Sequence, residues 1–284
     1  MTKTIAVLGA GTMGHGIAQV CAQAGYAVRL RDIDESATKR GLDAIQQMLS
    51  KGVIKEKMTQ EQANAALAHI TTTTELAAAV ADADLIIEAV PERLDLKQRV
   101  FADVLAHASS DAILATNTSS IPIADIGATL KAEARSRLIG LHFFNPVPLM
   151  PLLEIVTSQD TSGATLKAAR DLAERIGKDA IVVKDTPGFA TSRLGVAIGL
   201  EAIRMLEEGV ANAEDIDKAM TLGYKHPMGP LRLTDLVGLD VRLHIAETLT
   251  TKLGERFTPP QLLRDKVAKG KLGKKTGEGF HVWP

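Results

Sequence analysis

The residues most suited to chemistry are a histidine and a glutamate near the middle of the chain. His142 follows the apolar run 138–141, and Glu154 lies inside the apolar stretch 152–156. A carboxylate is costly to bury in such surroundings unless it is paired, and a histidine is a natural partner. Three prolines between the two forbid a regular helix, so the chain must turn or run extended and could bring them together. Such a pair is a common acid–base device, although a histidine at a strand end is more often structural.

A second polar cluster, Asn117-Thr118-Ser119-Ser120, follows the strand-like run 112–116. Ligands of open α/β sheets bind outside the carboxyl ends of the strands, so this cluster and His142 are expected at the mouth of a site. The alternative is that Asn117 and Ser119 only cap the next helix.

A phosphate-binding turn is indicated at the start of the chain. An apolar strand leads from Thr4 into the glycine motif formed by Gly9, Ala10, Gly11, Thr12, Met13 and Gly14, and a helical pattern follows. The glycines permit a tight turn and close approach of a pyrophosphate, and the helix N-terminus favours its negative charge. Asp32 ends the next strand, where a carboxylate binds the adenosine ribose. The sequence therefore predicts a bound NAD, against the alternative of a turn whose glycines serve packing only.

The elements that position these residues alternate between strands and helices through the first two-thirds of the chain. Strands are expected at 27–31, 84–89, 112–116, 138–141, 152–156 and 181–183, which predicts an α/β fold with a Rossmann-type doubly wound, mostly parallel sheet. Beyond Asp185-Thr186-Pro187 the pattern is helical. We therefore expect an NAD-binding domain at 1–186 and an all-helical domain at 187–284 for substrate binding and dimerisation. The helix 193–206 is apolar almost all round, which favours a subunit interface.

The bulk composition excludes several classes of function. The formal net charge of the 284 residues is −1, so no basic field favours nucleic acid or a membrane surface. Cys21 is the only cysteine, which precludes an internal disulfide and a cysteine metal cluster, so no metal is expected. No apolar run is long enough to span a membrane, and we expect a cytoplasmic protein.

Six motifs in register carry a resemblance over nearly the whole chain. Besides the opening glycines and Asn117–Ser120, they are His142-Phe143-Phe144-Asn145-Pro146, Asp185-Thr186-Pro187-Gly188-Phe189, Pro227-Met228-Gly229-Pro230 and Gly273-Lys274-Lys275-Thr276-Gly277-Glu278-Gly279-Phe280. In this order they resemble the 3-hydroxyacyl-CoA dehydrogenases, and most of all the bacterial 3-hydroxybutyryl-CoA dehydrogenases. The resemblance implies an enzyme that interconverts 3-hydroxyacyl-CoA and 3-ketoacyl-CoA with NAD. It also implies a substrate with a short acyl chain and a homodimeric protein.

The resemblance also implies roles for single residues. His142 would be the general base or acid, Glu154 would orient it, and Ser119 would bind the substrate oxygen. Lys55, with Lys51, would contact the CoA phosphates. The NAD contacts would fall on the opening glycine motif and on Asp32, Glu92, Lys97, Asn117, Ser119, Asn145 and Lys275.

One departure from the family pattern concerns substrate binding. Ser192 stands where the family usually has an asparagine that helps to hold the substrate. A serine can still donate a hydrogen bond, but its shorter side chain needs closer approach or a bridging water. Two other functions stay open at this point: a related dehydrogenase of a CoA-free hydroxy or sugar acid, and a catalytically silent NAD-binding protein.

Overall fold

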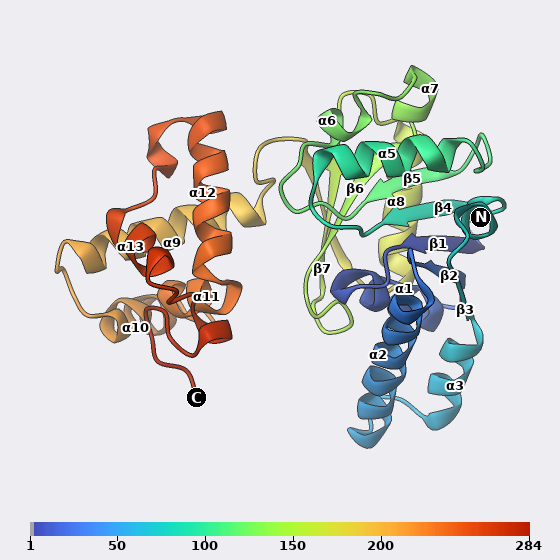
Figure 1. The fold of residues 1–284 in the computed structure, drawn as a ribbon. Coiled ribbons are helices and arrows are strands. Elements are labelled where there is room, and N and C mark those ends of the chain that lie inside the picture. Colours follow the sequence, from blue (N-terminus) through green and yellow to red (C-terminus); the bar gives the residue numbers. More distant parts are fainter. Residues whose placement is uncertain (1–2) are drawn as a thin grey trace. The chain divides into compact units, whose positions relative to one another are not determined.

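The computed structural model describes residues 3–284, which form two compact units (Figure 1). The first unit ends at Asp185, and the second comprises Thr186–Pro284. The first is an α/β unit with one sheet, and the second is built from helices. The predicted fold class is therefore confirmed.

One eight-stranded sheet forms the centre of the first unit, in the order β3-β2-β1-β4-β5-β6-β7-β8. The strands are β1 (Thr4–Leu8), β2 (Ala27–Arg31), β3 (Ile70–Thr73), β4 (Leu85–Glu88), β5 (Ile113–Thr116), β6 (Leu138–Phe143), β7 (Leu152–Thr157) and β8 (Asp179–Lys184). All neighbours pair in parallel except β6 and β7, which are antiparallel. The strand order reverses between β1 and β4, and such a switch point is where open α/β sheets bind ligands.

Helices follow most of the parallel strands, as crossover connections require. They are α1 (Thr12–Gln23), α2 (Glu35–Ile54), α3 (Gln60–Ala68), α4 (Leu76–Val80), α5 (Leu94–Leu105), α6 (Ile123–Gly127), α7 (Ala132–Arg135) and α8 (Gly163–Arg175). The apolar face of α1 is buried with the sheet strands in one hydrophobic core, which includes Ile17, Cys21, Leu30 and Ile87. Burial raises the pKa of the Cys21 thiol to about 12, so this cysteine is a core residue.

The helical unit has its own core. Its elements are α9 (Thr191–Glu207), α10 (Ala213–Gly223), α11 (Pro230–Val237), α12 (Leu239–Leu253) and α13 (Gln261–Ala268), with short 3₁₀ turns η1 (Glu255–Phe257) and η2 (Lys274–Thr276). Side chains from α9, α10, α11, α12 and α13 meet in a cluster that includes Leu200, Ile216, Leu231, Leu249 and Leu263.

Strand β3 was not predicted from the sequence. Its residues, Ile-Thr-Thr-Thr, bury only Ile70 fully, because β3 lies at the edge of the sheet and pairs with β2 alone. A strand with one buried side chain has no apolar alternation to detect. The short helices α4, α6 and α7 were also missed, since four or five residues carry little helical periodicity.

Candidate active site

His142 and Glu154 form a buried pair across neighbouring strands. They are direct partners in the antiparallel register of β6 and β7, so their side chains share one face of the sheet. His142 Nδ1 donates to Glu154 Oε2 over 2.6 Å, a length typical of a charge-assisted hydrogen bond. The Glu154 side chain is fully buried, whereas that of His142 keeps 9% of its surface exposed. This geometry fixes the proton on Nδ1 and presents Nε2 as the ring atom for proton exchange.

Lys178 holds the segment that joins the two strands. Its Nζ donates to the carbonyl oxygens of Val147 and Met150, each over 2.6 Å. Val147 is buried, and a Cβ on Gly16 of α1 would stand 2.9 Å from it. Burial lowers the pKa of Lys178. No sequence pattern indicates this role, because a lysine before a strand is ordinarily a solvent-exposed residue.

An ion triad of one lysine and two glutamates lies at the carboxyl ends of β4 and β5, and the side chain of Glu92 is its partly exposed member. Lys97 Nζ donates to both oxygens of Glu88, over 2.7 and 3.0 Å, and lies 3.3 Å from Glu92 Oε2. The side chains of Lys97 and Glu88 are fully buried, and the Thr116 hydroxyl also donates to Glu88 over 2.7 Å. Glu88 was not among the predicted residues. Lys97 was predicted as a contact to NAD, but its ammonium is enclosed by these two carboxylates.

Glu92 orders the loop that follows β5. Its Oε1 accepts hydrogen bonds from the Thr118 hydroxyl and from the backbone N–H groups of Ser119 and Ser120, over 2.6, 2.9 and 3.0 Å. Burial raises the pKa of Glu92, but the Lys97 ammonium and these hydrogen bonds outweigh it and lower the pKa below its usual range. The ionised carboxylate thus holds Ser119 in place.

Asn117 connects this loop to the histidine strand. Its side-chain oxygen accepts a hydrogen bond of 3.0 Å from the backbone N–H of Phe143, the residue after His142. The polar cluster after β5 is therefore joined directly to the end of β6, the strand that extends through His142 to Phe143.

The glycine turn after β1 suits a dinucleotide. Gly9 has φ +105°, and a Cβ on Gly14 would stand 1.7 Å from the Gly9 carbonyl oxygen, so neither position tolerates a side chain. A Cβ on Gly11 would meet nothing within 4 Å, which leaves open space beside the turn. Helix α1 begins there with no side-chain cap and no acidic residue in its first turn. Its N–H groups and positive dipole end are available to an anionic group.

Asp32 lies beside this turn at the end of β2. Its two oxygens accept hydrogen bonds from the N–H groups of Ala10 and Ile33, each over 2.7 Å. Carboxylate oxygens each accept more than one hydrogen bond, so Asp32 retains capacity for ribose hydroxyls. The turn, the open space and the acid together fit NAD.

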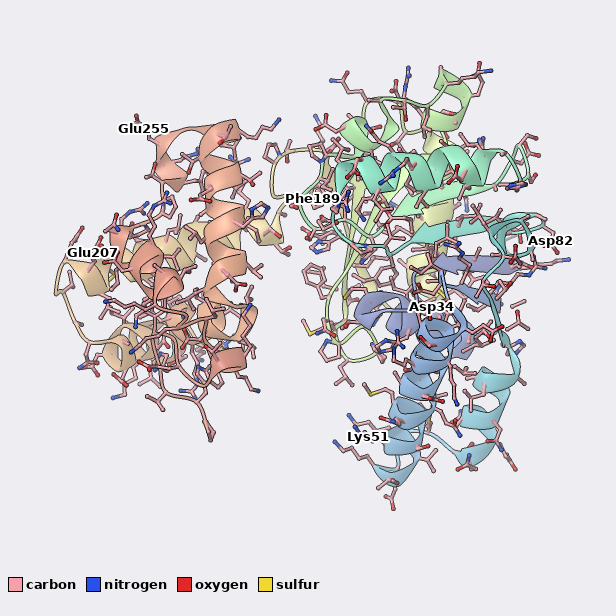
Figure 2. All side chains as sticks on the ribbon, viewed as in Figure 1. Asp34, Lys51, Asp82, Phe189, Glu207 and Glu255 are labelled. Atoms are coloured by element: carbon pink, nitrogen blue, oxygen red, sulfur yellow. The ribbon has the colours of Figure 1, made fainter. Side chains whose placement is uncertain are left out.

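The other predicted residues are not joined to these by any contact described in residues 3–284. Lys51 and Lys55 are exposed at the end of α2, and Figure 2 shows Lys51 at the opposite end of that helix from Asp34. Asn145 is exposed after β6. Ser192 and Lys275 belong to the helical unit, where Lys275 Nζ binds both oxygens of Asp240 over 2.6 Å.

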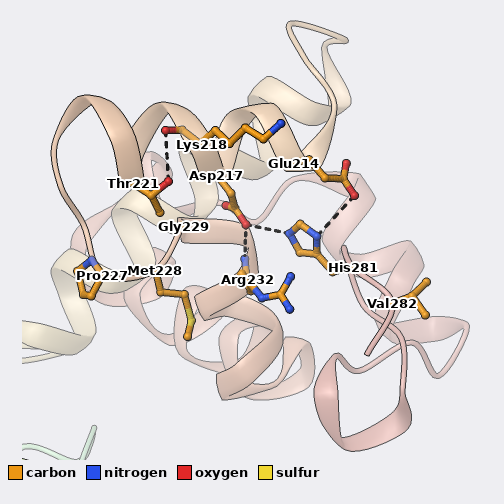
Figure 3. A pocket seen from close by; sticks show the side chains of 10 residues that line it. All are labelled: Glu214, Asp217, Lys218, Thr221, Pro227, Met228, Gly229, Arg232, His281 and Val282. Carbon is orange, nitrogen blue, oxygen red and sulfur yellow. Dashed lines mark hydrogen bonds and ion pairs between the residues drawn. The ribbon is translucent and has the colours of Figure 1, made fainter. Parts of the chain in front are cut away.

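A second carboxylate–imidazole pair, not predicted, lies in the helical unit (Figure 3). His281 Nε2 is 2.8 Å from Asp217 Oδ2, beside an open hollow of about 560 Å³. Asp217 also accepts hydrogen bonds from the N–H groups of Leu231 and Arg232, over 2.8 and 3.0 Å. Asp217 thus caps α11 and fastens the chain end to it, which is a structural role.

Residues 3–284 contain neither a cluster of metal-ligating side chains nor a membrane-spanning helix. No group of three or more histidine, cysteine or acidic side chains could hold a metal ion there. In the same residues, no helix has both the length and the apolar character to cross a membrane.

Comparisons with known proteins agree along the whole chain. Residues 4–186 match the family model described as 3-hydroxyacyl-CoA dehydrogenase, NAD binding domain, and residues 188–283 match that of the C-terminal domain. The 3-hydroxybutyryl-CoA dehydrogenase of Mycobacterium tuberculosis is 42% identical over 284 residues, which cover 99% of this chain and 98% of the relative. A probable 3-hydroxybutyryl-CoA dehydrogenase of Bacillus subtilis is also 42% identical, over 98% of this chain and 96% of its own. The crystal structure of (S)-3-hydroxybutyryl-CoA dehydrogenase from Ralstonia eutropha has a TM-score of 0.96 and 40% identity, with both chains fully covered.

Proposed function

Because this chain belongs to the 3-hydroxyacyl-CoA dehydrogenase family and is NAD-dependent, we propose that its substrates are short-chain acyl-CoA thioesters and that it interconverts 3-hydroxybutyryl-CoA and acetoacetyl-CoA. The observation that carries the proposal is the His142–Glu154 pair, in which a buried carboxylate orients an imidazole that stays partly exposed. This pair also argues against a catalytically silent protein.

His142 is the proton-transfer residue of the proposed mechanism. In oxidation, neutral His142 takes the proton of the 3-hydroxyl on Nε2, while Nδ1–H stays bonded to Glu154. The carboxylate then stabilises the imidazolium, and in reduction the same nitrogen returns the proton. Bound in this unit, NAD would supply the hydride acceptor for oxidation at C3, and NADH the hydride donor for reduction.

Two serines are proposed to position the substrate. Ser119 is held by Glu92 through its backbone N–H, and its hydroxyl is assigned to the substrate oxygen. Ser192, at the start of α9, is proposed to hydrogen-bond the substrate through its hydroxyl.

The first unit is proposed to hold NAD through the glycine motif, Asp32, Glu92 and the loop after β5. In this assignment Lys97 acts mainly through Glu92, because its ammonium is buried between two carboxylates. Asn117 acts by fixing the loop to β6. Asn145 and Lys275 remain proposed contacts to the cofactor.

Lys55, with Lys51, is proposed to attract the CoA phosphates. Both are exposed, and residues 3–284 supply no ion-pair partner for either ammonium. Lys55→Ala should raise KM for acetoacetyl-CoA more than it lowers kcat, with an effect that shrinks at high salt. Lys39→Ala, which removes an exposed lysine near the start of the same helix, is the matched control. An unchanged KM at low ionic strength would show that Lys55 is only a solvated surface residue.

A homodimer formed through the helical unit is also proposed. Large apolar side chains are exposed on α9 and α11, including Leu194 at 62%, Ile198 at 40% and Leu236 at 44%. Apolar surface gathered on a compact unit commonly marks an interaction site. Light scattering at micromolar concentration should give twice the mass of one chain, and a monomer would contradict the proposal. A cytoplasmic location stays an expectation.

The direct test of the function is an assay of NADH loss with acetoacetyl-CoA. We expect turnover with acetoacetyl-CoA and little with free acetoacetate, which separates this function from that of a CoA-free hydroxy acid dehydrogenase. Equal turnover of the free acid would favour that second function. Longer 3-ketoacyl-CoAs in the same assay define the preferred chain length.

A further inference from the structure

Asp185 caps a helix that lies far from it in sequence. Helix α6 begins after Pro122, and no side chain at that N-cap position accepts its N–H groups. Asp185 Oδ2 instead accepts a hydrogen bond of 2.8 Å from the backbone N–H of Ala124, in the first turn of α6. The backbone N–H of Asp185 donates to the carbonyl oxygen of Thr157 over 2.9 Å, which ties Asp185 to the end of β7. The residue after β8 thus supplies the acceptor and the negative charge that stabilise a helix N-terminus.

The carboxylate of Asp185 occupies an unfavourable place. Its Oδ1 atom is completely buried and has no hydrogen-bond partner in residues 3–284. Burial raises the pKa of Asp185, and hydrogen bonds from the N–H groups of Ala124 and Ile123 offset that rise only in part. A buried polar atom without a partner is rare in native proteins and calls for an explanation beyond stability. The surroundings of α6 supply one.

Helix α6 connects the Ser119 loop to the strand that carries His142. Only residues 120–122 separate Ser119 from the first residue of α6, Ile123. The Ile123 side chain is fully buried, and a Cβ on Gly140 would stand 2.8 Å from its Cδ1 atom. Gly140 lies on β6 two residues before His142, so both positions face the same side of the sheet. The position of α6 against β6 therefore sets the position of the loop relative to the imidazole.

We propose that Asp185 is a positioning residue, which by capping α6 holds the Ser119 hydroxyl in register with His142. The inference rests on the proposed function, in which Ser119 binds the substrate oxygen whose proton His142 exchanges. Glu92 holds the N–H groups of Ser119 and Ser120, and Asp185 anchors the helix into which the loop continues. A misplacement of about 1 Å at a reacting centre can lower a rate a hundredfold, so both anchors matter. All of these groups belong to the first unit.

The test is a double-mutant cycle on the reduction of acetoacetyl-CoA by NADH. We expect Asp185→Ala to lower kcat/KM about threefold to thirtyfold, because the loss of a helix cap shifts a local equilibrium by about that factor. In a chain that already carries Ser119→Ala, the same change should lower kcat/KM by less than about twofold, because no hydroxyl is left to position. Residues that act independently of each other would multiply their effects instead.

Two further variants separate positioning from general stability. Asp185→Asn keeps an acceptor oxygen at nearly the same volume, so its kcat/KM should fall less than that of Asp185→Ala. It also takes the place of Asp185→Ala in the cycle if that variant does not fold. Asp84→Ala is the matched control, since Asp84 Oδ2 accepts hydrogen bonds from the N–H groups of Lys3 and Thr4, over 2.7 and 2.9 Å, at the amino ends of β1 and β4. It should lower the free energy of unfolding in urea and leave kcat/KM unchanged.

Three results would overturn the inference while leaving the proposed function intact. The first is a kcat/KM for Asp185→Ala within about twofold of the unaltered protein. The second is an equal loss from Asp185→Ala in the chains with and without Ser119→Ala. The third is a loss of kcat/KM in Asp84→Ala as large as that in Asp185→Ala. Failure of the unaltered protein to reduce acetoacetyl-CoA would refute the proposed function itself, and the inference with it.

Discussion

Replacing Glu154 by glutamine removes one buried charge at nearly constant volume. The lost carboxylate oxygen is 2.6 Å from His142 Nδ1, and the glutamate side chain is fully buried. A glutamine can still bond to the imidazole through either its oxygen or its amide group. The substitution therefore tests the charge and the direction of the hydrogen bond rather than the packing.

The magnitude follows from two effects. A hydrogen bond to a charged group contributes about 1.5–3 kcal/mol, and each 1.36 kcal/mol of barrier changes a rate tenfold. Loss of charge alone therefore lowers kcat for hydroxyl oxidation about tenfold to a hundredfold. If the amide N–H turns toward Nδ1, the imidazole proton moves to Nε2, which then cannot accept the hydroxyl proton. The analogous change in serine proteases costs about 10⁴-fold. We expect a loss of kcat between ~10² and 10⁴.

The assay follows NADH formation from 3-hydroxybutyryl-CoA, with NADH affinity measured in parallel by fluorescence. Glu154→Gln should keep the wild-type NADH affinity, because the glutamate is fully buried and paired with His142. Glu174→Gln, at an exposed position of α8, is the control for loss of one negative charge. A Glu154→Gln protein with kcat within about threefold of wild type would refute the assigned role.

Three further predictions concern the first unit. Lys97→Met should lower the free energy of unfolding in urea by about 3–5 kcal/mol, because it leaves Glu88 buried and unpaired, and Glu88→Gln in the same chain should recover part of that loss. The carboxylate of Asp32 should repel a 2′-phosphate, so kcat/KM should favour NAD over NADP; equal values would show that Arg31 accommodates the phosphate instead. The ionised form of Glu92 stabilises the fold, because its pKa is lower folded than unfolded. Glu92→Gln should therefore lower the free energy of unfolding by its full amount above about pH 4.3, the ordinary pKa of a glutamate. The difference between the two proteins should disappear as the pH falls through the lower pKa of folded Glu92. A difference that persists in acid would contradict this.

The sequence was sufficient to predict the helices and strands that have strong local patterns. The opening strand, glycine turn and α1 follow from consecutive residues, and the Rossmann-type sheet with a helical second unit is confirmed. The closeness of His142 and Glu154 could be predicted, because the prolines between them exclude a regular helix and the acid lies within an apolar strand. That β6 and β7 pair antiparallel, with these two residues opposite each other, is a matter of register that no local pattern specifies.

The residues that support the site could not be predicted from the sequence in the same way. Glu88 and Lys97 acquire their meaning from each other, and each alone resembles an ordinary charged residue beside an apolar run. Lys178 binds carbonyl oxygens about 30 positions earlier in the chain, a distance at which sequence spacing carries no signal.

The central claim is that His142 transfers the substrate proton, and the most direct test is kcat of the His142→Gln protein. With acetoacetyl-CoA and NADH we predict a loss of about 10²–10⁴-fold, the usual contribution of a general acid, with NADH affinity close to that of the unaltered protein. Full activity of His142→Gln would mean that His142 is a structural histidine and that the proposed mechanism is wrong.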